Sequence, residues 1–386
     1  MNIAIDIRNI GRNRTGSEVV VLQLVKKVLE KDHYNQYFLL TDTRDQHVLH
    51  YVSKVLFLKS KNNVKLVSLP SPHRVIWLFF SVAFFLRKAR IDVFHTEYIV
   101  PFFIPSHICV LTHIHDVSFA DPAIRPLIST KDLFILDRLM PRSLRRANHI
   151  IAVSHFTMNQ IQKYYGYEAP KVVMIYNAAA YGTPEDDLPH VTTDAIVQKY
   201  SLPKKYIFAL GTMQPRKNIP FLIEAFACVA SKIPNTHLVL SGPRAKSFDM
   251  LIETTLKRYP DIAKRVHFTG YIAPADLDFV YGGAICTVHP SLYEGFGLPL
   301  LESFWAEVPV MASDIPAYRE IAGGGALYFD PHEIDHCCEV LYTVCTDKIV
   351  RQEILSQAQK LRERFSWEVS ADLFLDLYVR NPQKSS

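Results

Sequence analysis

Apolar segments of strand length alternate with amphipathic segments of helix length along this chain, in two successive series. The first series has apolar segments at residues 2–7, 37–40, 64–67, 92–94, 109–112 and 150–153, and the second at 206–210, 236–241, 266–268 and 284–288. Between residues 17 and 31, Val21, Leu24, Val25, Val28 and Leu29 recur at the spacing of one helix face. This alternation predicts an α/β fold with two doubly wound parallel sheets, each covered by helices on both faces.

A segment of different composition separates the two series. Residues 182–190 are rich in proline and acidic side chains and have no hydrophobic period, which is typical of a linker. We therefore expect a first domain at residues 1–180, a linker at 181–204 and a second domain at 205–365. A final helix is expected within residues 366–386, opened by Phe365-Ser-Trp367. A length of 386 residues suits two such domains.

Two glutamates, Glu294 and Glu302, flank a glycine-containing segment directly after the last apolar segment of the second series. Gly295 and Gly297 predict an exposed turn, and Pro299 predicts the first turn of a helix, where a missing N–H costs little. Backbone N–H groups at such a helix start favour a phosphate. The two carboxylates need hydrogen-bond donors as partners, and the hydroxyls of a sugar and a ribose would serve.

A second candidate phosphate site lies in Gly211-Thr-Met-Gln-Pro-Arg216-Lys217-Asn218, between an apolar segment and a predicted helix. Asn218 is in the position of an N-cap residue. Arg216 and Lys217 put two cations at the positive end of the helix dipole, which is unfavourable unless an anion binds there. Arg216 can bind two phosphate oxygens at once, whereas Lys217 acts as a point charge. The pattern predicts a site for a diphosphate.

Both elements resemble motifs of one family. Ser291-Leu-Tyr-Glu294-Gly-Phe-Gly-Leu-Pro299, together with Glu302, is similar to the E-x7-E element of retaining glycosyltransferases of family 4, and residues 211–218 match the G-x4-R-K-N element of the same family. The resemblance covers most of the chain and is more specific in the second half. It implies the GT-B fold, in which two Rossmann-like domains face a cleft and the terminal helix commonly crosses back to the first domain.

The resemblance also implies roles for these residues. Glu294 would contact the transferred sugar, and Glu302 would hold the ribose of a nucleotide sugar. Arg216 and Lys217 would neutralise the diphosphate leaving group. The diphosphate would also meet the backbone amides of four consecutive residues, namely Gly295, Phe296, Gly297 and Leu298.

Residues 113–119, His-Ile-His-Asp-Val-Ser-Phe, resemble the H-D-x-S-F element of a bacterial branch of family 4 that is rich in mannosyltransferases. The resemblance implies that His115 approaches the sugar C6 hydroxyl and the reacting centre, although a lone histidine on a strand is more often a packed core residue. His113 shares a strand face with His115 but has weaker support from the motif. Asp116 would either orient His115 or meet the acceptor. His95 lies at another predicted strand end.

Two further donor contacts follow from the resemblance. Gly16, in the loop after the first strand, is expected near the donor diphosphate, and Tyr271, in Gly270-Tyr-Ile272, is expected near the base. Gly11 and Gly16 are five residues apart and do not fit the G-x-G-x-x-G spacing of a dinucleotide-binding loop. That spacing argues against a dehydrogenase.

Together these features predict a retaining glycosyltransferase that works without a metal or other cofactor, because the cations and amides oppose the charge of the leaving group. The donor is expected to be GDP-mannose, with UDP-glucose, UDP-N-acetylglucosamine and dTDP- or GDP-deoxysugars left open. The acceptor is expected to be a glycan or a lipid-linked glycan in cell-surface polysaccharide or lipopolysaccharide synthesis. A nucleotide-sugar 2-epimerase and an inactive scaffold of the same fold are the alternatives.

The composition is that of a globular protein. A net charge of +5 is modest and local, so no nucleic-acid partner is expected. The six cysteines form no C-x-x-C pair and are interpreted as reduced packing residues. The amino-terminal residues 1–6 lack a basic segment and include Asp6, which argues against a signal peptide and predicts a cytoplasmic protein.

The apolar residues 75–86, Val-Ile-Trp-Leu-Phe-Phe-Ser-Val-Ala-Phe-Phe-Leu, precede Arg87, Lys88 and Arg90. The run is too short to span a bilayer. It predicts either a buried helix of the first domain or a face that rests on an anionic membrane, such as the cytoplasmic face of the inner membrane.

Overall fold

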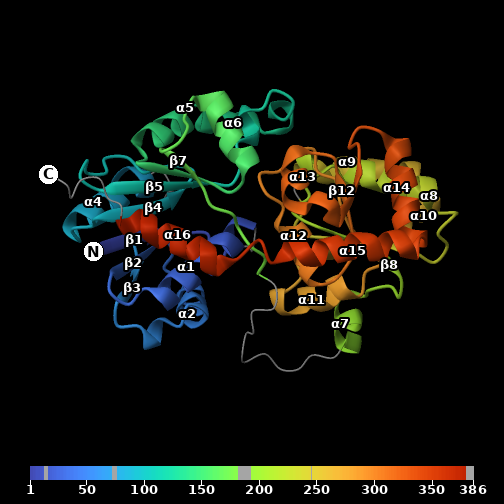
Figure 1. The fold of residues 1–386 in the computed structure, drawn as a ribbon, viewed down its shortest axis with the longest axis horizontal. Helices are drawn as coiled ribbons and strands as arrows, with labels where there is room; N and C mark the ends of the chain where they lie inside the picture. Colours follow the sequence, from blue (N-terminus) through green and yellow to red (C-terminus); the bar gives the residue numbers. More distant parts are fainter. Residues whose placement is uncertain (13–15, 72–75, 181–192, 245, 380–386) are drawn as a thin grey trace. The chain divides into compact units, whose positions relative to one another are not determined.

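The computed structural model describes residues 1–12, 16–71, 76–180, 193–244 and 246–379, shown as coloured ribbon in Figure 1. The chain divides into two compact units. The first contains most of residues 1–178 together with the residues from Ser366 onward, and the second contains Ala179–Phe365. Each unit is built on one parallel sheet, so the predicted α/β fold class with two doubly wound sheets is confirmed.

The sheet of the first unit has seven strands in the order β3-β2-β1-β4-β5-β6-β7. The strands are β1 (Asn2–Asp6), β2 (Gln36–Thr41), β3 (Val64–Ser68), β4 (Val93–Glu97), β5 (Cys109–Ile114), β6 (His149–Ala152) and β7 (Val172–Met174), and the main helices are α1 (Gly16–Lys31), α2 (Gln46–Val55), α4 (Val82–Lys88), α5 (Thr130–Arg146), α6 (His155–Tyr165) and α16 (Trp367–Val379). Every residue of β5 is buried, as expected for a central strand covered on both faces. The sequence pattern missed β7, a short edge strand that pairs with β6 from Ile150↔Val172 onward.

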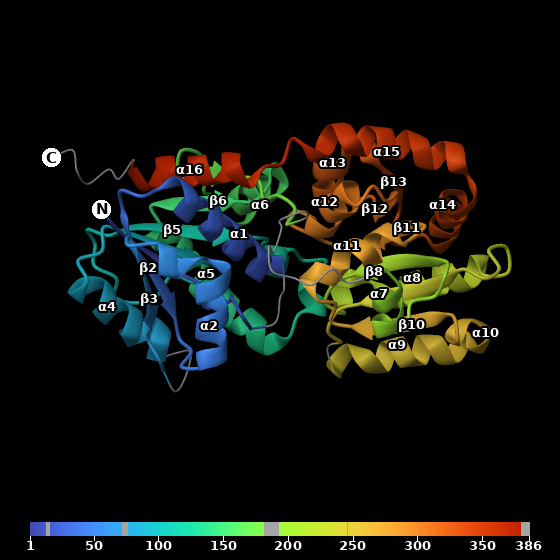
Figure 2. The ribbon, with the colours of Figure 1, turned by 90° about the horizontal axis from the view of Figure 1, so that it is seen from below.

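The last helix, α16, packs on this first unit beside α1 (Figure 2). Lys27 and Lys31 on α1 lie 3.0 and 2.6 Å from Glu368 and Asp372 on α16. Deeper in the unit, the Tyr378 hydroxyl lies 2.9 Å from Nδ1 of His95. The helix is therefore held both by surface ion pairs and by a buried polar contact.

The apolar run at residues 75–86 has two different faces. Residues 72–75 lie outside the described part of the chain; from there a π-helical turn at Trp77–Ser81 leads into α4. The Trp77 ring is fully buried, and the Arg8 guanidinium lies 3.6 Å from its centroid. Phe80 and Phe84, however, are 60% and 71% exposed. The prediction of a simple buried helix is therefore wrong for the outer face of this segment.

The sheet of the second unit has six parallel strands in the order β10-β9-β8-β11-β12-β13. They are β8 (Tyr206–Leu210), β9 (His237–Ser241), β10 (Val266–Gly270), β11 (Cys286–His289), β12 (Val310–Ser313) and β13 (Ala326–Phe329), and the helices are α7 (Thr193–Tyr200), α8 (Ile219–Val229), α9 (Lys246–Arg258), α10 (Pro260–Ala263), α11 (Pro274–Gly282), α12 (Leu298–Trp305), α13 (Pro316–Ala322), α14 (Ile334–Thr346) and α15 (Lys348–Arg362). The first four strands were predicted within one or two residues, whereas β12 and β13 were not.

Alternate residues of β8 enter two different cores, as the period of a strand requires. Ile207 and Ala209 pack with α8, α9 and α14 on one face of the sheet. Tyr206 and Phe208 pack with α7 and α11 on the opposite face (Figure 1).

Helix α7 corrects the predicted linker. Residues 181–192 of that linker lie outside the described residues, but 193–200 form α7. Ile196 on α7 and Leu202 after it are buried in the core around Tyr206 and Val280. Residues 193–204 are thus part of the second unit, because their apolar side chains cover one face of its sheet.

Candidate active site

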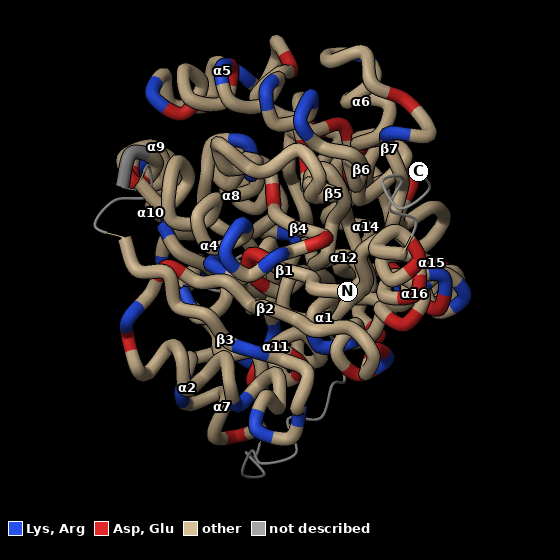
Figure 3. Tube along the Cα trace, turned by 90° about the vertical axis from the view of Figure 1, so that its left-hand side faces the viewer, with Lys and Arg blue, Asp and Glu red and all other residues tan. Residues whose placement is uncertain are grey.

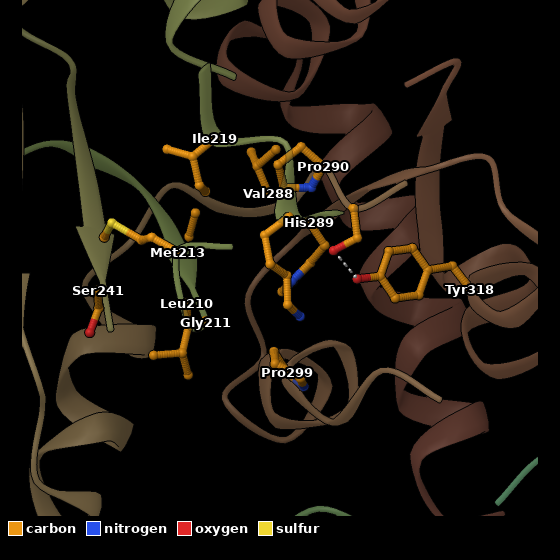
Figure 4. A pocket seen from close by; sticks show the side chains of 13 residues that line it. Leu210, Gly211, Met213, Ile219, Ser241, Val288, His289, Pro290, Pro299 and Tyr318 are labelled. Atoms are coloured by element: carbon orange, nitrogen blue, oxygen red, sulfur yellow. Dashed lines mark hydrogen bonds between the residues drawn. The ribbon is translucent and has the colours of Figure 1, made fainter. Parts of the chain in front are cut away.

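A pocket opens at the carboxyl ends of β8, β9 and β11, where ligands bind in open parallel sheets (Figure 4). Its lining includes Gly211 after β8, Ser241 at the end of β9 and His289 at the end of β11. Lys217, Ser291 and Tyr318 add further polar groups to the lining. Lys217 is a predicted site residue that lies in this lining.

The cation pair of the second unit converges on the first glutamate. Arg216 Nη1 lies 2.9 Å and Lys217 Nζ 2.5 Å from the same oxygen, Oε1 of Glu294. The Arg216 guanidinium also donates to the Tyr293 carbonyl at 3.0 Å. Burial alone would raise the pKa of the Glu294 carboxyl, but Arg216 and Lys217 lower it to about 2. Glu294 is therefore a buried, ionised carboxylate at neutral pH. Arg216 and Lys217 both contact its Oε1 atom.

Sequence reasoning missed a chain of hydroxyls behind this carboxylate. The Ser291 hydroxyl donates to Oε1 of Glu294 at 2.8 Å, and the Tyr318 hydroxyl donates to Ser291 at 3.2 Å. His289 is buried next to them, and burial together with Lys217 lowers its pKa to about 3, so its ring is neutral. The positions of Ser291 and His289 at a strand end were a usable sequence signal, whereas Tyr318 comes from α13, far along the chain.

The turn between the two glutamates has the predicted form. Gly297 stands at the N-cap of α12 with φ 118°, in the region that favours glycine, and Pro299 lies in the first turn. A Cβ at Gly297 would come within 3.0 Å of the Tyr318 ring. Gly297 has no side chain that could cap this helix start. The amides at the start of α12 therefore suit an anion.

Asn218 corrects one prediction. It stands at the N-cap position of α8, but its backbone is left-handed with φ 56°, and its side chain does not cap the helix. The side-chain amide of Asn218 instead donates a hydrogen bond to the Pro331 carbonyl at 3.1 Å. Asn218 thus fixes the turn that carries Arg216 and Lys217, because a left-handed backbone is tolerated by asparagine better than by most residues.

Glu302 lies one turn inside α12, as predicted, and has a partner that the sequence did not indicate. The buried Tyr281 hydroxyl, on α11, donates to Oε2 of Glu302 at 2.7 Å. Burial raises the pKa of Glu302 despite this hydrogen bond, and burial raises the pKa of nearby Asp278 to about 6. The Tyr281 contact occupies Oε2 and so orients the carboxylate.

The remaining predicted donor residues lie at element ends. Tyr271 directly follows β10, at the carboxyl edge of the second sheet, and is 51% exposed. Gly16 is the first residue of α1 in the first unit and is exposed. Residues 13–15 of its loop lie outside the described residues.

His115 directly follows β5 in the first unit, and its Nε2 contacts Oε1 of Glu97 at the end of β4. Asp116 does not orient His115: its carboxylate accepts hydrogen bonds from the backbone and hydroxyl of Ser118 at 3.0 and 2.7 Å. Glu97 is the carboxylate that contacts His115 instead, because the parallel strands β4 and β5 end side by side. The Tyr98 ring packs 5.6 Å from the His115 ring.

The other two histidines of this region are core residues. His113 and His95 are buried, and their ring centroids lie 5.6 and 5.0 Å from that of Phe374 on α16. Burial lowers the pKa of His95 to about 4 and that of His113 well below its usual value, so both rings are neutral. His95 lies in the middle of β4 and not at its end as expected.

Two family models match the chain, one mainly in the first unit and one in the second. The model described as "Glycosyltransferase Family 4" matches residues 14–179, and the one described as "Glycosyl transferases group 1" matches residues 193–361. These matches confirm the resemblance drawn from the motifs.

Among known proteins, the O-antigen chain mannosyltransferase B of Escherichia coli is 29% identical over 303 residues, which are 77% of this chain and 74% of that protein. A serotype-specific mannosyltransferase of the same organism is 27% identical over 62% of this chain, but this match covers only 30% of that longer protein. A solved structure of Anabaena Alr3699/HepE with UDP and glucose shares the fold, with a TM-score of 0.74 at 17% identity, over 98% of this chain and 100% of that one.

Proposed function

This chain belongs to glycosyltransferase family 4, and from that premise we propose that it is a retaining mannosyltransferase that uses GDP-mannose and needs no metal. That it is a glycosyltransferase follows from the family models and the mannosyltransferase relatives. The donor, the stereochemistry and the absence of a metal are parts of the proposal. So is the acceptor, a glycan or lipid-linked glycan of the O-antigen or lipopolysaccharide type.

One observation carries the proposal: Arg216 and Lys217 converge on a single oxygen beside the start of α12. Arg216 and Lys217 each carry one positive charge and Glu294 carries one negative charge, so these three side chains together carry a charge of +1. A diphosphate that reached it would meet both cations and the amides of the helix start. Such fixed charges stabilise the negative charge that develops on a departing nucleoside diphosphate.

Glu294 and Glu302 can then act as hydrogen-bond acceptors. The low pKa of Glu294 keeps it ionised, so it can accept a hydrogen bond from a hydroxyl of the transferred sugar. Tyr281 occupies Oε2 of Glu302, and Oε1 would take the ribose hydroxyl. The predicted contact of His115 with the sugar stays a prediction.

For the transfer step we propose front-side attack. The bond from the anomeric carbon to the phosphate oxygen breaks, the acceptor oxygen bonds to the same face of that carbon, and the acceptor proton goes to the departing phosphate oxygen. Glu294 would stabilise the oxocarbenium-like sugar during this exchange. Trapping a covalent glycosyl adduct on the enzyme during turnover would refute this step.

The donor is chosen from the relatives. The two reported above are named as mannosyltransferases, which favours mannose and favours transfer over 2-epimerisation. UDP- and dTDP-sugars remain the alternative donors. UDP is included in the test below because the Anabaena structure of the same fold was solved with UDP.

The test is a binding and turnover panel. GDP, UDP and dTDP are compared by thermal shift, and GDP-mannose, UDP-glucose and UDP-N-acetylglucosamine are compared in transfer assays with and without EDTA. We expect GDP to stabilise the protein where UDP does not, and EDTA to leave transfer unchanged. Stabilisation by UDP alone would overturn the donor, and loss of activity in EDTA would overturn metal independence.

Two variants test the roles of the glutamates. Glu302→Ala should weaken the stabilisation by GDP. Glu294→Gln should abolish transfer but keep or strengthen GDP binding, because Arg216 and Lys217 lose the anion that partly neutralises them. A Glu294→Gln protein with full transfer activity would refute the role assigned to Glu294.

A further inference from the structure

The first unit exposes a cluster of phenylalanines far from the pocket residues in sequence. We call it the phenylalanine surface: its exposed members are Ile76, Phe80, Phe84 and Phe103, and its half-buried members are Phe79 and Phe102. Phe84 is 71% and Phe103 62% exposed. Soluble proteins rarely expose a contiguous group of large apolar side chains without a partner for it.

The cluster is contiguous and built from two chain segments. The Phe79 ring stacks on Phe102 with centroids 3.9 Å apart, and the Phe80 and Phe103 rings lie 6.2 Å apart. The Phe102 amide donates to the Leu78 carbonyl at 2.8 Å and so joins the segments. The surface is therefore a fixed feature of the unit and not a set of independent side chains.

The backbone also holds Phe103 outward against its own preference. Its φ of 56° lies in the left-handed region, which is uncommon for a bulky residue. Such a conformation persists only where the surrounding structure imposes it, and it tends to occur where function requires it. A phenylalanine held exposed in this way indicates a surface that meets an apolar partner.

Cations border the phenylalanine surface. Arg87 and Lys88 follow Phe84 by three and four residues on α4, so they continue its exposed face. Several Lys and Arg residues lie on α5, where they are blue in Figure 3. The Arg142 guanidinium lies 3.7 Å from the Phe102 ring centroid, and that of Arg138, one turn earlier, lies 3.6 Å from the Phe134 ring centroid. No Asp or Glu occurs between residues 76 and 91 or between 99 and 115.

From this combination we infer that the phenylalanine surface docks on an anionic lipid bilayer. Aromatic and aliphatic side chains can enter the boundary between headgroups and acyl chains, while the exposed Arg87, Lys88 and Arg138 side chains meet lipid phosphates. Arg142 instead donates to the Val100 and Pro101 carbonyls and holds the second segment in place. Charge complementarity favours lipid over another protein surface, because cations border the apolar centre and residues 76–91 and 99–115 contain no Asp or Glu. On α5, Asp137 is paired with Arg125 at 2.8 Å. Among the residues that the structure describes, none of the helices is long and apolar enough to cross a membrane. The surface would therefore rest on a bilayer.

The experiment is sedimentation of the full chain with vesicles of phosphatidylglycerol and phosphatidylethanolamine, or of phosphatidylcholine alone. We expect binding to the anionic vesicles only, weakening as salt rises. The double variant Phe80→Ser/Phe84→Ser should lower the partition coefficient on the order of tenfold or more, and Arg87→Gln/Lys88→Gln should lower it and reduce its salt dependence. The matched control is Met250→Ser/Leu251→Ser, two exposed apolar residues of α9, which should bind as the original chain does.

A second measurement reports insertion directly. Phe84→Trp should show a blue shift of tryptophan emission on addition of anionic vesicles. GDP binding by every variant, measured in parallel, separates this inference from the proposed donor, since the phenylalanine surface lies in the first unit and Arg216, Lys217 and Glu302 lie in the second. Equal binding to both vesicle types would overturn the inference, and so would loss of binding in Met250→Ser/Leu251→Ser. The inference would also be wrong if the phenylalanine variants changed the self-association of the protein and left its vesicle binding unchanged.

Discussion

The hydroxyl of Tyr281, on α11, donates a 2.7 Å hydrogen bond to Oε2 of Glu302, on α12. Tyr281 is fully buried, so this bond cannot be exchanged for one to water. It leaves Oε1 as the oxygen that a ribose hydroxyl can reach. Tyr281 is therefore a positioning residue for the proposed ribose contact.

Tyr281→Phe should weaken nucleotide binding. Loss of one hydrogen bond to a carboxylate corresponds to about 1–2 kcal/mol, or roughly a fivefold to thirtyfold higher Kd. Titration calorimetry with GDP measures it. Tyr206→Phe is the matched control, because its buried hydroxyl donates to the Val280 carbonyl and not to the site. An unchanged Kd in Tyr281→Phe, or an equal loss in the control, would argue against the positioning role.

Lys217→Met should weaken the binding of GDP on the order of tenfold and leave the binding of guanosine unchanged, because the lysine would meet only the diphosphate. Competition binding with the two ligands gives the comparison. Lys257→Met, on the exposed face of α9, serves as the control for removal of one positive charge. Equal losses for GDP and guanosine would show that Lys217 supports the pocket and does not bind the phosphates.

Acid should selectively remove the stability that Glu294 contributes. Its pKa in the folded state is about 2, below the usual 4.5, so the contribution is present above pH 4.5 and is lost as the pH falls from 4.5 towards 2. The full contribution is on the order of 2–3 kcal/mol. The free energies of unfolding in urea of the original chain and of Glu294→Gln should differ most near pH 6, and the difference should fall by about half by pH 3.

Buried His95 complicates the comparison, because its pKa is lowered to about 4 and the protein loses stability as the unfolded chain takes up a proton below pH 6.5. This loss is common to both proteins, so it cancels in their difference. A difference that stays constant from pH 6 to pH 3 would contradict the assigned ionisation of Glu294.

Gly297→Ala should destabilise the second unit by about 1–3 kcal/mol, because φ is 118° and the new Cβ would meet the Tyr318 ring at 3.0 Å. Gly282→Ala is the control, because Gly282 lies at the end of α11 with no atom within 4 Å of a new Cβ. Thermal unfolding measures both. A stable Gly297→Ala protein would show that the turn can relax away from Tyr318.

Glu97→Gln should lower turnover without changing GDP binding. The reason is that Glu97 contacts Nε2 of His115 and fixes its ring orientation, and the family resemblance puts His115 near the reacting sugar. Steady-state kinetics over a range of pH should show a lower kcat and an altered pH profile. Turnover at the original rate and with the original profile would remove Glu97 from the proposed chemistry.

Most of the fold was readable from the sequence because its signals are local. Strand β8 was predicted to the residue, since an uninterrupted apolar run marks it. Strand β7 and helix α7 were missed, because β7 is a short edge strand and α7 follows an aperiodic segment. The burial of Ile196 that holds α7 in place depends on residues about 80 positions away, such as Val280.

The sequence by itself determined the residues of the candidate donor site, because Arg216, Lys217, Glu294 and Glu302 stand in motifs with fixed spacing. Only the tertiary structure decided their partners. Tyr281, Tyr318 and Glu97 reach the predicted residues from other helices and strands, and hydrogen bonds between distant segments leave no period in the sequence. The tertiary structure also decided which apolar side chains are exposed. Trp77 and Phe84 belong to the same apolar run, but Trp77 is buried beneath Arg8 and Phe84 lies at the surface.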